Sequence, residues 1–442
     1  MSNQRGEFGS RTGFILAAAG SAIGLGNIWR FPYVAGENGG GAFLVLYIAM
    51  VFTVGLSIML AEIAIGRATR RNPVGAFAAL KGGAWTGVGY MGVLAGFVIL
   101  SFYSVIGGWT LAYTWATLGP LLKSSNPDAM AAHFEHFISD PTQTLVYHGL
   151  FMAMTITIVM GGIEKGIERA AKLLMPVLFI MLVALCLRAV TLPGAWQGVE
   201  FFTTPDWSRV TAGTFNAALS QAFFSLSLGM GALLTYGSYL SKHERLPSVA
   251  IWVTSLDTLM ALMAGLMILP AVFAFGYNPA AGPGLTFITL PAVFAQMPGG
   301  TLFGPLFFAL LAVAALTSAV SLLETVVAYT VDEKGTNRKP ATIAMGTAIF
   351  FLGVPSAMSL GPWADIKFFG KTFLNLMDYL ASNLLMPLGG IAIAIFAGWV
   401  VGQRMREEVD DSGKAYQMVS IWLWVLRTAA PGAVIWILLS GL

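Results

Sequence analysis

Charge-free runs that are long enough to cross a lipid bilayer are plentiful in this sequence. They occupy residues 82–122, 141–163, 210–241, 258–323 and 379–403. Crossing the hydrocarbon core takes about 20 apolar residues in a helix, because no water is present there to satisfy the backbone. Charged residues make up 10% of the chain, against about 25% in an average soluble protein. We therefore predict an all-α polytopic membrane protein.

Hydropathy and breaks rich in glycine and proline divide the chain into eleven expected spanning helices. We place them at about 12–35, 41–68, 86–122, 143–162, 167–188, 211–240, 246–275, 302–331, 340–358, 372–400 and 417–440. The run at 258–323 is too long for one span, and the segment from Gly276 to Gly300 divides it. We expect this segment to be a long outer loop that carries short helices of its own.

Basic residues are distributed unevenly between the two sides of the predicted bundle. The side of the N-terminus holds Arg5, Arg11, Arg67, Arg70, Arg71, Lys81, Lys165, Arg169, Lys172, Lys242, Arg245, Lys334, Arg338, Lys339, Arg404, Arg406 and Lys414. The opposite side holds Lys123, Arg188, Arg209, Lys367 and Lys371. Cytoplasmic loops carry the excess of basic residues, so the N-terminus is predicted to be cytoplasmic and the C-terminus to lie outside. The absence of any Asn-X-Ser/Thr sequon favours a bacterial inner (plasma) membrane.

The first predicted helix is interrupted near its middle by residues that do not suit a continuous span. Between Gly20 and Pro32 it carries two further glycines, Asn27 and Arg30. Glycine weakens a helix interior, and in hydrocarbon each polar side chain and freed backbone group needs a partner. Membrane proteins tolerate such a break where it lines a cavity or binds a ligand. The stretch is therefore a candidate site.

A second interruption, made of small and polar residues, lies at Ser225–Gly231 in the sixth predicted helix. Paired interruptions in corresponding helices of two halves indicate a transporter site near the bilayer midplane. If helices 1–5 and 6–10 are the two repeats, their odd helix number inverts one relative to the other, and helix 11 is peripheral. The alternative is that Gly229 and Gly231 only permit close helix packing.

Several stretches resemble the signature of the neurotransmitter:sodium symporter family, in its bacterial amino-acid transporter branch. They are Gly13–Gly20, Asn27–Tyr33, Glu37–Phe43, Gln221–Ser227 and Leu316–Ser318. The resemblance extends over helices 1–10, which is nearly the whole chain. It implies a LeuT-like 5+5 inverted repeat with discontinuous helices 1 and 6 and eleven spans in all. Its parts would be a first repeat at 1–190, a second repeat at 191–402 and a peripheral helix at 403–442.

The resemblance also implies an activity. Members of the family couple Na⁺ entry to uptake of amino acids or amine neurotransmitters by alternating access, so we expect a secondary active symporter and not an enzyme. The expected partners are an L-amino acid, Na⁺ at two sites and the lipid bilayer, without an organic cofactor. The sequence shows no nucleophile–base constellation, no phosphate-cradling loop and no basic stripe that would bind nucleic acid.

A zwitterionic amino acid needs donors for its carboxylate and oxygen acceptors for its ammonium group. A broken helix offers freed N–H groups at the start of its second half, near Leu25 and Gly26, and freed carbonyls around Ala22. By resemblance, Tyr103 would donate its hydroxyl to the substrate carboxylate. The expected substrate-binding residues are Ser21, Ala22, Leu25, Gly26, Ile99, Tyr103, Phe224, Ser225, Ser227, Met230, Ser318 and Leu322.

Sodium prefers a dehydrated cage of carbonyl, hydroxyl and carboxylate oxygens. By resemblance, the first site would join Ala22, Asn27, Ser225 and Asp257 with the substrate carboxylate itself. The second site would take backbone oxygens of Gly20, Ile23 and Ala314 and the hydroxyls of Thr317 and Ser318. The alternative is that both hydroxyls only bond back onto their own helix.

Asp257 lies within an apolar run, where a carboxylate is expensive and usually functional. The family more often has asparagine at this position, and its chloride-dependent members bind chloride nearby. Ala261, one turn on, stands in the place of their chloride-binding serine. We expect Asp257 to supply the negative charge itself, so that transport needs no chloride. The alternative is a structural carboxylate paired with a buried donor.

Charged residues on both sides of the predicted site resemble the gates of the family. Arg30 and Asp378 would form the outer gate, with Phe224 and Tyr103 as its lid. Arg5 and Asp332 would form the inner gate, with Tyr239 nearby. Glu62 is a charge in an apolar context, and we expect it to brace the unwound backbone of helix 6.

The expected wall around the substrate side chain is apolar apart from small hydroxyls. Desolvating a charged side chain there would cost several kcal/mol, so charged amino acids are disfavoured. Met230 is flexible and able to repack. We therefore expect hydrophobic or aromatic L-amino acids, with small neutral amino acids as the alternative. A channel or a proton-coupled carrier of similar architecture also remains open, although a carrier of the latter kind tends to have a basic residue near Thr317 and Ser318.

Overall fold

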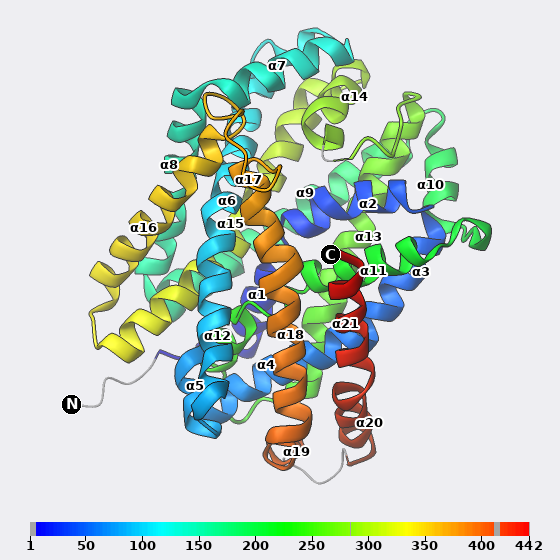
Figure 1. Ribbon diagram of the computed structural model, residues 1–442. Helices are drawn as coiled ribbons and strands as arrows, with labels where there is room; N and C mark the ends of the chain where they lie inside the picture. Colours follow the sequence, from blue (N-terminus) through cyan, green and yellow to red (C-terminus); the bar gives the residue numbers. More distant parts are fainter. Residues whose placement is uncertain (1–5, 283, 411–415, 442) are drawn as a thin grey trace.

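The computed structural model describes residues 6–282, 284–410 and 416–441, and it is built of helices (Figure 1). In this described part, nine helical segments are long and apolar enough to cross a membrane. They are Gly41–Thr69, Gly83–Leu118, Pro141–Met160, Ile163–Val190, Leu246–Ala274, Gly300–Lys334, Arg338–Met358, Phe373–Val400 and Gln417–Leu439. A tenth candidate is the pair Arg11–Ala22 and Gly26–Glu37, which is bent by 51°.

The first half of the chain follows the expected order of helices. The label η marks short π-helical or 3-10 segments. Its elements are α1 (Arg11–Ala22), η1 (Gly26–Arg30), α2 (Phe31–Glu37), α3 (Gly41–Met50), η2 (Val51–Gly55), α4 (Leu56–Thr69), α5 (Pro73–Leu80), η3 (Gly83–Trp85), α6 (Thr86–Leu118), η4 (Leu121–Lys123), α7 (Pro127–Ser139), α8 (Pro141–Met160), η5 (Ile163–Glu168), α9 (Arg169–Val190) and α10 (Ala195–Thr203).

The second half begins with a short 3-10 turn and contains the second broken helix. Its elements are η6 (Trp207–Arg209), α11 (Ala212–Ser225), α12 (Ala232–Gly237), α13 (Leu246–Ala274), η7 (Leu285–Thr289), α14 (Leu290–Gln296), α15 (Gly300–Lys334), α16 (Arg338–Met358), α17 (Phe373–Tyr379), η8 (Leu380–Leu385), α18 (Met386–Ile395), η9 (Phe396–Val400), α19 (Gly402–Val409), α20 (Tyr416–Arg427) and α21 (Ala429–Gly441).

Local sequence signals explain where several of these helices begin. Asn72, Asn126 and Asp140 each stand directly before a proline, and their side chains accept hydrogen bonds from N–H groups in the first turn of α5, α7 and α8. Proline suits the first helical position because its missing N–H has no partner there in any case. Thr211 and Thr214 form a reciprocal capping pair at the start of α11.

The two long helices α6 and α15 are the most buried of the candidate spans, and they pack along each other. The first broken helix lies among them, since α1 contacts α9, α13 and α15. In Figure 1, α16 and α8 stand at one side of this core, and α20 and α21 stand beside α18 at the other. Both helix breaks are thus enclosed by other helices.

The predicted helices match the observed ones to within a few residues, and the outer loop at 276–300 carries η7 and α14, as expected. The sixth predicted segment forms two pieces, α11 and α12, neither of which is long enough to span a bilayer alone. The sequence analysis missed α5, α7, α10 and α19. These short helices lie between the spans, so a search for long apolar runs does not detect them.

Candidate functional site

The break in the first helix exposes backbone groups in the middle of the bundle. Ile23 has an extended backbone, and its N–H still bonds to the Ala19 carbonyl at 2.7 Å. The Leu25 N–H is free of the helix and donates to the Tyr103 hydroxyl at 3.1 Å. A Cβ on Gly24 would lie 2.4 Å from Ser318 Oγ and 2.7 Å from the Tyr103 hydroxyl, so only glycine fits there.

The break in the sixth helix is held open by left-handed residues. Ser227, Gly229 and Gly231 have φ of 54°, 79° and 71°, between the end of α11 and the start of α12. The Gly229 N–H donates to the Glu62 carboxylate at 2.7 Å, and Glu62 is fully buried. Glu62 therefore braces the unwound backbone, as the sequence analysis expected.

The two breaks face each other across a short distance. Ser227 Oγ donates to the Ser21 carbonyl at 3.0 Å, and Gln221 Nε2 donates to the Gly26 carbonyl at 2.8 Å. A Cβ on Gly26 would lie 2.8 Å from the Phe224 ring. Polar groups of both broken helices are thus brought together within one buried region.

The remaining residues of the expected substrate wall lie on the elements around this region. Ile99 is buried one turn before Tyr103 on α6, and Leu322 is buried one turn after Ser318 on α15. Met230 is buried within the unwound part of the sixth helix. The sequence analysis missed one polar neighbour, since Ser21 Oγ donates to Ser321 Oγ at 2.7 Å. Both serines stand in apolar context, so spacing alone does not pair them.

Asp257 is the centre of a buried hydrogen-bond network at the first predicted cation site. Asn27 Nδ2 lies 2.8 Å from Asp257 Oδ1 and 3.0 Å from Ser225 Oγ. Ser225 Oγ donates to Asp257 Oδ2 at 2.8 Å and accepts from the Tyr47 hydroxyl at 3.0 Å. These four side chains are fully buried, and they come from η1, α3, α11 and α13. Tyr47 was not predicted, because nothing in the sequence around it distinguishes it from a core aromatic residue.

Ala22, the other residue assigned to the first cation site, is buried at the C-terminal end of α1. Asn27 is also tied to the break itself, since its Oδ1 accepts from the Gly24 N–H at 3.3 Å. The Asn27 side chain thus links the Asp257 carboxylate to the helix break at Gly24. The first cation site and the start of η1 therefore form one unit.

The second predicted cation site joins α15 to the end of α1. Ser318 Oγ lies 3.3, 3.1 and 3.4 Å from the carbonyl oxygens of Gly20, Ser21 and Ile23. Thr317 Oγ1 lies 2.9 Å from the Ala314 carbonyl on its own helix and 3.5 Å from the Ile23 carbonyl. Thr317 thus bonds partly to its own helix, whereas Ser318 reaches the broken helix.

No group of three or more His, Cys, Asp or Glu side chains that could hold a metal ion is found among the described residues. The oxygen-rich sites above are of a different kind. They contain backbone carbonyls, hydroxyls, one amide and one carboxylate, which suit a hard monovalent cation better than a transition metal.

On the predicted cytoplasmic side, two groups of charged residues lie near the ends of α15 and α16, and the carboxylate of Glu324 is buried in one of them. Tyr239 donates its hydroxyl to Glu324 Oε1 at 2.7 Å, and Arg338 forms an ion pair with Glu324. Asp332 accepts from the backbone N–H and the side-chain amide of Asn72 at 3.1 and 3.2 Å. Arg5, the predicted partner of Asp332, lies outside the described residues.

On the opposite side, Arg30 stands over the Phe224 ring at 4.8 Å and lies 3.4 Å from Ser220 Oγ. Asp378 accepts from Ser382 Oγ at 3.0 Å. Within the described part of the chain, Arg30 and Asp378 form no direct ion pair. Their pairing in an outer gate stays a prediction.

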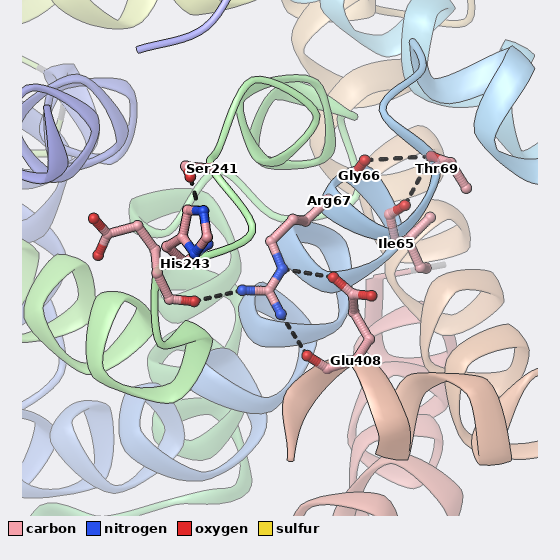
Figure 2. Close-up of polar contacts among 8 residues, drawn as sticks. Ile65, Gly66, Arg67, Thr69, Ser241, His243 and Glu408 are labelled. Atoms are coloured by element: carbon pink, nitrogen blue, oxygen red, sulfur yellow. Dashed lines mark hydrogen bonds and ion pairs between the residues drawn. The ribbon is translucent and has the colours of Figure 1, made fainter. Parts of the chain in front are cut away.

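Arg67, near the C-terminal end of α4, makes a further cluster that was not predicted from the sequence (Figure 2). It is buried, forms an ion pair with Glu408 at 2.6 Å and donates to the Glu408 and Glu244 carbonyls at 2.5 Å each. The cluster links α4 to α19 and to the loop before α13. Figure 2 shows His243 and Ser241 of that loop on the other side of Arg67 from Glu408.

Known proteins match nearly the whole chain. The model of the "Sodium:neurotransmitter symporter family" matches residues 5–129 and 129–442. The "Uncharacterized sodium-dependent transporter YhdH" of Bacillus subtilis is 41% identical, over 98% of this chain and 97% of its own length. The "Sodium- and chloride-dependent glycine transporter 2" of Xenopus laevis is 26% identical over 92% of this chain and 60% of its own length.

A solved structure also matches, described as "Crystal structure of MhsT in complex with L-phenylalanine". Its chain is 47% identical and superposes with a TM-score of 0.91, covering 99% of this chain and 100% of its own. The similarity therefore extends over nearly the whole chain in both fold and sequence.

Proposed function

Since the chain belongs to the sodium:neurotransmitter symporter family, we propose that it imports hydrophobic or aromatic L-amino acids together with Na⁺ by alternating access, without requiring chloride. Family membership makes it a sodium-dependent transporter and not an enzyme. The observation that carries the finer proposal is the junction of the two helix breaks, with the Asp257 network beside it. We place the protein in a bacterial inner membrane with a cytoplasmic N-terminus and the C-terminus outside.

The backbone break around Leu25 would bind the substrate carboxylate. The Leu25 N–H and the Tyr103 hydroxyl lie 3.1 Å apart, so one carboxylate oxygen can accept from both. Gly24 and Gly26 leave no side chain between these donors and the helices opposite. The Ser21 carbonyl, which accepts from Ser227 Oγ, is an acceptor for the ammonium group.

Coupling to the first Na⁺ follows from the position of Asn27, two residues after Leu25. Asn27, Ser225 and Asp257 would bind the ion, and the substrate carboxylate at Leu25 would complete its shell. Two ligands that share a contact raise each other's affinity by the same factor, which makes the binding of amino acid and Na⁺ mutually dependent.

The second Na⁺ would hold the broken helix in place. The carbonyl oxygens of Gly20 and Ile23 at the end of α1 already lie 3.3 and 3.4 Å from the hydroxyl of Ser318 on α15. An ion bound here would tie α1 to α15, and its release would free α1 to move. This site would therefore act on conformation more than on substrate affinity.

The substrate side chain would lie among Ile99, Phe224, Met230 and Leu322. Except for Phe224, which is partly buried, these residues are buried, and all are apolar. Two buried carboxylates near the breaks already have partners, since Asp257 bonds to Asn27 and Ser225, and Glu62 accepts from the Gly229 N–H. A charged substrate side chain would thus lose its hydration without gaining a counter-ion. The structural relative MhsT was solved with L-phenylalanine, which agrees with this class.

Chloride independence is proposed from Asp257 and Ala261. Asp257 supplies a fixed negative charge beside the first cation site, and Ala261, one turn later, is buried and has no hydroxyl to bind an anion. An additional anion next to Asp257 would face like-charge repulsion in a site of low dielectric.

The test is uptake by proteoliposomes given a panel of amino acids, with an inward Na⁺ gradient and with chloride or gluconate as the anion. We expect uphill uptake of phenylalanine, leucine and similar residues that collapses without the Na⁺ gradient and is unchanged in gluconate. Preference for glycine or alanine would replace the substrate class by small neutral amino acids. Passive flux would indicate a channel, and uptake driven by a proton gradient alone would indicate a proton-coupled carrier.

A further inference from the structure

Arg427 is a cation on the outer surface of the bundle, within the apolar segment Gln417–Leu439. It is the last residue of α20, and its side chain is exposed. An ionisable side chain in a membrane segment normally faces the bundle interior or pairs with another charge. No carboxylate among the described residues forms an ion pair with Arg427. Its charge is left facing the lipid.

The side chain of Arg427 packs against Gly398, Trp399 and Gly402 of the neighbouring segment, and we call this contact surface its seat. Its Nε donates to the Gly398 carbonyl at 2.7 Å, and its Cζ lies 5.8 Å from the centroid of the Trp399 ring. Trp399 Nε1 in turn lies 3.3 Å from the Arg427 carbonyl. A Cβ on Gly398 would lie 3.2 Å from Arg427 Cγ, and one on Gly402 would lie 3.1 Å from its Nη2. The two glycines, one turn apart, thus make room for the guanidinium group.

This seat fixes the side chain but leaves part of its hydrogen-bonding capacity unused. A guanidinium group carries five N–H donors, and among the described residues only the Nε donor of Arg427 has a protein acceptor. The two terminal nitrogens, Nη1 and Nη2, carry the other four donors in a planar fork. That geometry matches two oxygens of a phosphate or carboxylate group.

If the sixth-helix break lies at the bilayer midplane, helix length puts Arg427 near the depth of the lipid headgroups. The Met386 carbonyl lies against Gly229 in the sixth-helix break, and Gly398 follows Met386 by twelve residues, at most about 18 Å of helix. The direction is toward the predicted cytoplasmic side, and half the hydrocarbon core measures about 15 Å. Trp399 and Trp424 beside Arg427 are 65% and 62% exposed, as expected of tryptophan at a membrane interface.

A second surface arginine shows that the open donors of Arg427 are not a general property of this protein. Arg188, at the other end of the bundle, also combines a carbonyl partner with an aromatic ring, that of Phe303 at 6.0 Å. Its Nε and Nη2 both donate to the Pro298 carbonyl, and its Nη1 lies 3.4 Å from Thr191 Oγ1. All three nitrogens of Arg188 therefore have protein acceptors.

We propose that Arg427, seated on Gly398 and Gly402 between Trp399 and Trp424, binds the phosphate of an anionic phospholipid in the inner leaflet. Nη1 and Nη2 take two phosphate oxygens, and the tryptophan rings contact the glycerol and upper acyl region. A net negative lipid is preferred to a zwitterionic one because no carboxylate of the described residues pairs with Arg427. The site is independent of the substrate and cation sites.

The test is native mass spectrometry of the purified full-length protein with phosphatidylglycerol or phosphatidylethanolamine. We expect one retained phosphatidylglycerol, with about tenfold weaker binding in Arg427→Gln, which removes the charge-assisted hydrogen bonds. Arg427→Lys keeps the charge without the fork, and about threefold weakening is expected. Inorganic phosphate at the same concentration should not displace the lipid, because it gains nothing from the apolar surface.

Arg188→Gln is the matched control, and its lipid binding should equal that of the wild type. Equal phosphatidylglycerol retention by wild type and Arg427→Gln would overturn the proposal, as would equal losses in Arg427→Gln and Arg188→Gln. If Arg427→Gln does not fold, the comparison of Arg427→Lys with Arg188→Lys decides, and identical binding by the two overturns it. Displacement by inorganic phosphate would show an anion site that is not specific for lipid, which also overturns it.

Discussion

The two predicted cation sites lie at the same broken helix, but they obtain their oxygens in different ways. The first site is built from side chains of four separate elements that converge on the carboxylate of Asp257. The second is built from backbone carbonyls at the end of α1, with Ser318 and Thr317 facing them from α15. The first site therefore depends on a charge, and the second depends on the path of the backbone.

From this difference we expect the two proposed sites to have different roles in transport. A site that contains a carboxylate and adjoins the substrate sets how tightly Na⁺ and amino acid bind together. A site made of helix-end carbonyls senses whether the broken helix is in place, because those carbonyls move with it. Substitutions at the first site should act on binding, and substitutions at the second should act on the conformational equilibrium as well.

The largest effect is expected from Asp257→Ala, which removes the only charge of the first site. Asn27 and Ser225 would each lose a buried hydrogen-bond partner, at a cost of about 3 kcal/mol or a factor of about 100. We expect Na⁺-driven uptake to fall by about this factor. Asp365→Ala, at an exposed loop position, is the matched control and should transport normally. Unchanged Na⁺ dependence in Asp257→Ala would remove Asp257 from the cation site.

The next largest effect is expected from Gly24→Ala, which tests the backbone that both sites share. The added methyl group would lie 2.4 Å from Ser318 Oγ and 2.7 Å from the Tyr103 hydroxyl. It would push the second site and the carboxylate donors apart, and we expect a loss of about thirtyfold in uptake, or about 2 kcal/mol. Gly87→Ala, on an exposed face of α6 with open space around it, is the control. Normal substrate affinity in Gly24→Ala would show that the break is wider than the structure indicates.

These same residues show which parts of the site can be predicted from the sequence. The breaks at Gly20–Pro32 and Ser225–Gly231 were predicted because glycine and polar residues are conspicuous within apolar helices. Asp257 was predicted for the same reason. Tyr47 and Ser321 were missed, because a tyrosine or serine in an apolar run gives no signal until the fold brings its partner beside it.

Ion pairs between different helices of the bundle could not be predicted from the sequence either. Arg338 was assigned to the cytoplasmic side by its charge, but its ion pair with Glu324 depends on how α15 and α16 pack. The pairing of Arg67 with Glu408 joins residues on α4 and α19, two elements far apart in the chain. Hydropathy locates such residues at a membrane face, and only the tertiary structure selects their partners.

The hydroxyls of the second site allow a sharper comparison within one site. Ser318 lies within 3.4 Å of three carbonyls of the broken helix, whereas Thr317 bonds more closely to its own helix. We expect Ser318→Ala to raise the Na⁺ concentration for half-maximal uptake about tenfold and Thr317→Val about threefold. Thr114→Val, whose hydroxyl bonds only within α6, is the control. The reverse order of effects would mean that Thr317 turns toward α1 when Na⁺ binds.

The smallest effect is expected from exchanging the source of negative charge at the first site. Asp257→Asn combined with Ala261→Ser removes the fixed carboxylate and adds a hydroxyl one turn later on α13. A mobile anion could then take the place of the lost charge, so chloride should stimulate uptake about threefold over gluconate, a gain of less than 1 kcal/mol. Ala261→Ser alone is the control and should show no chloride effect, since Asp257 would repel the anion. Equal uptake in both anions by the double variant would mean that the first site needs no negative charge, which would leave Asp257 a hydrogen-bonding role only.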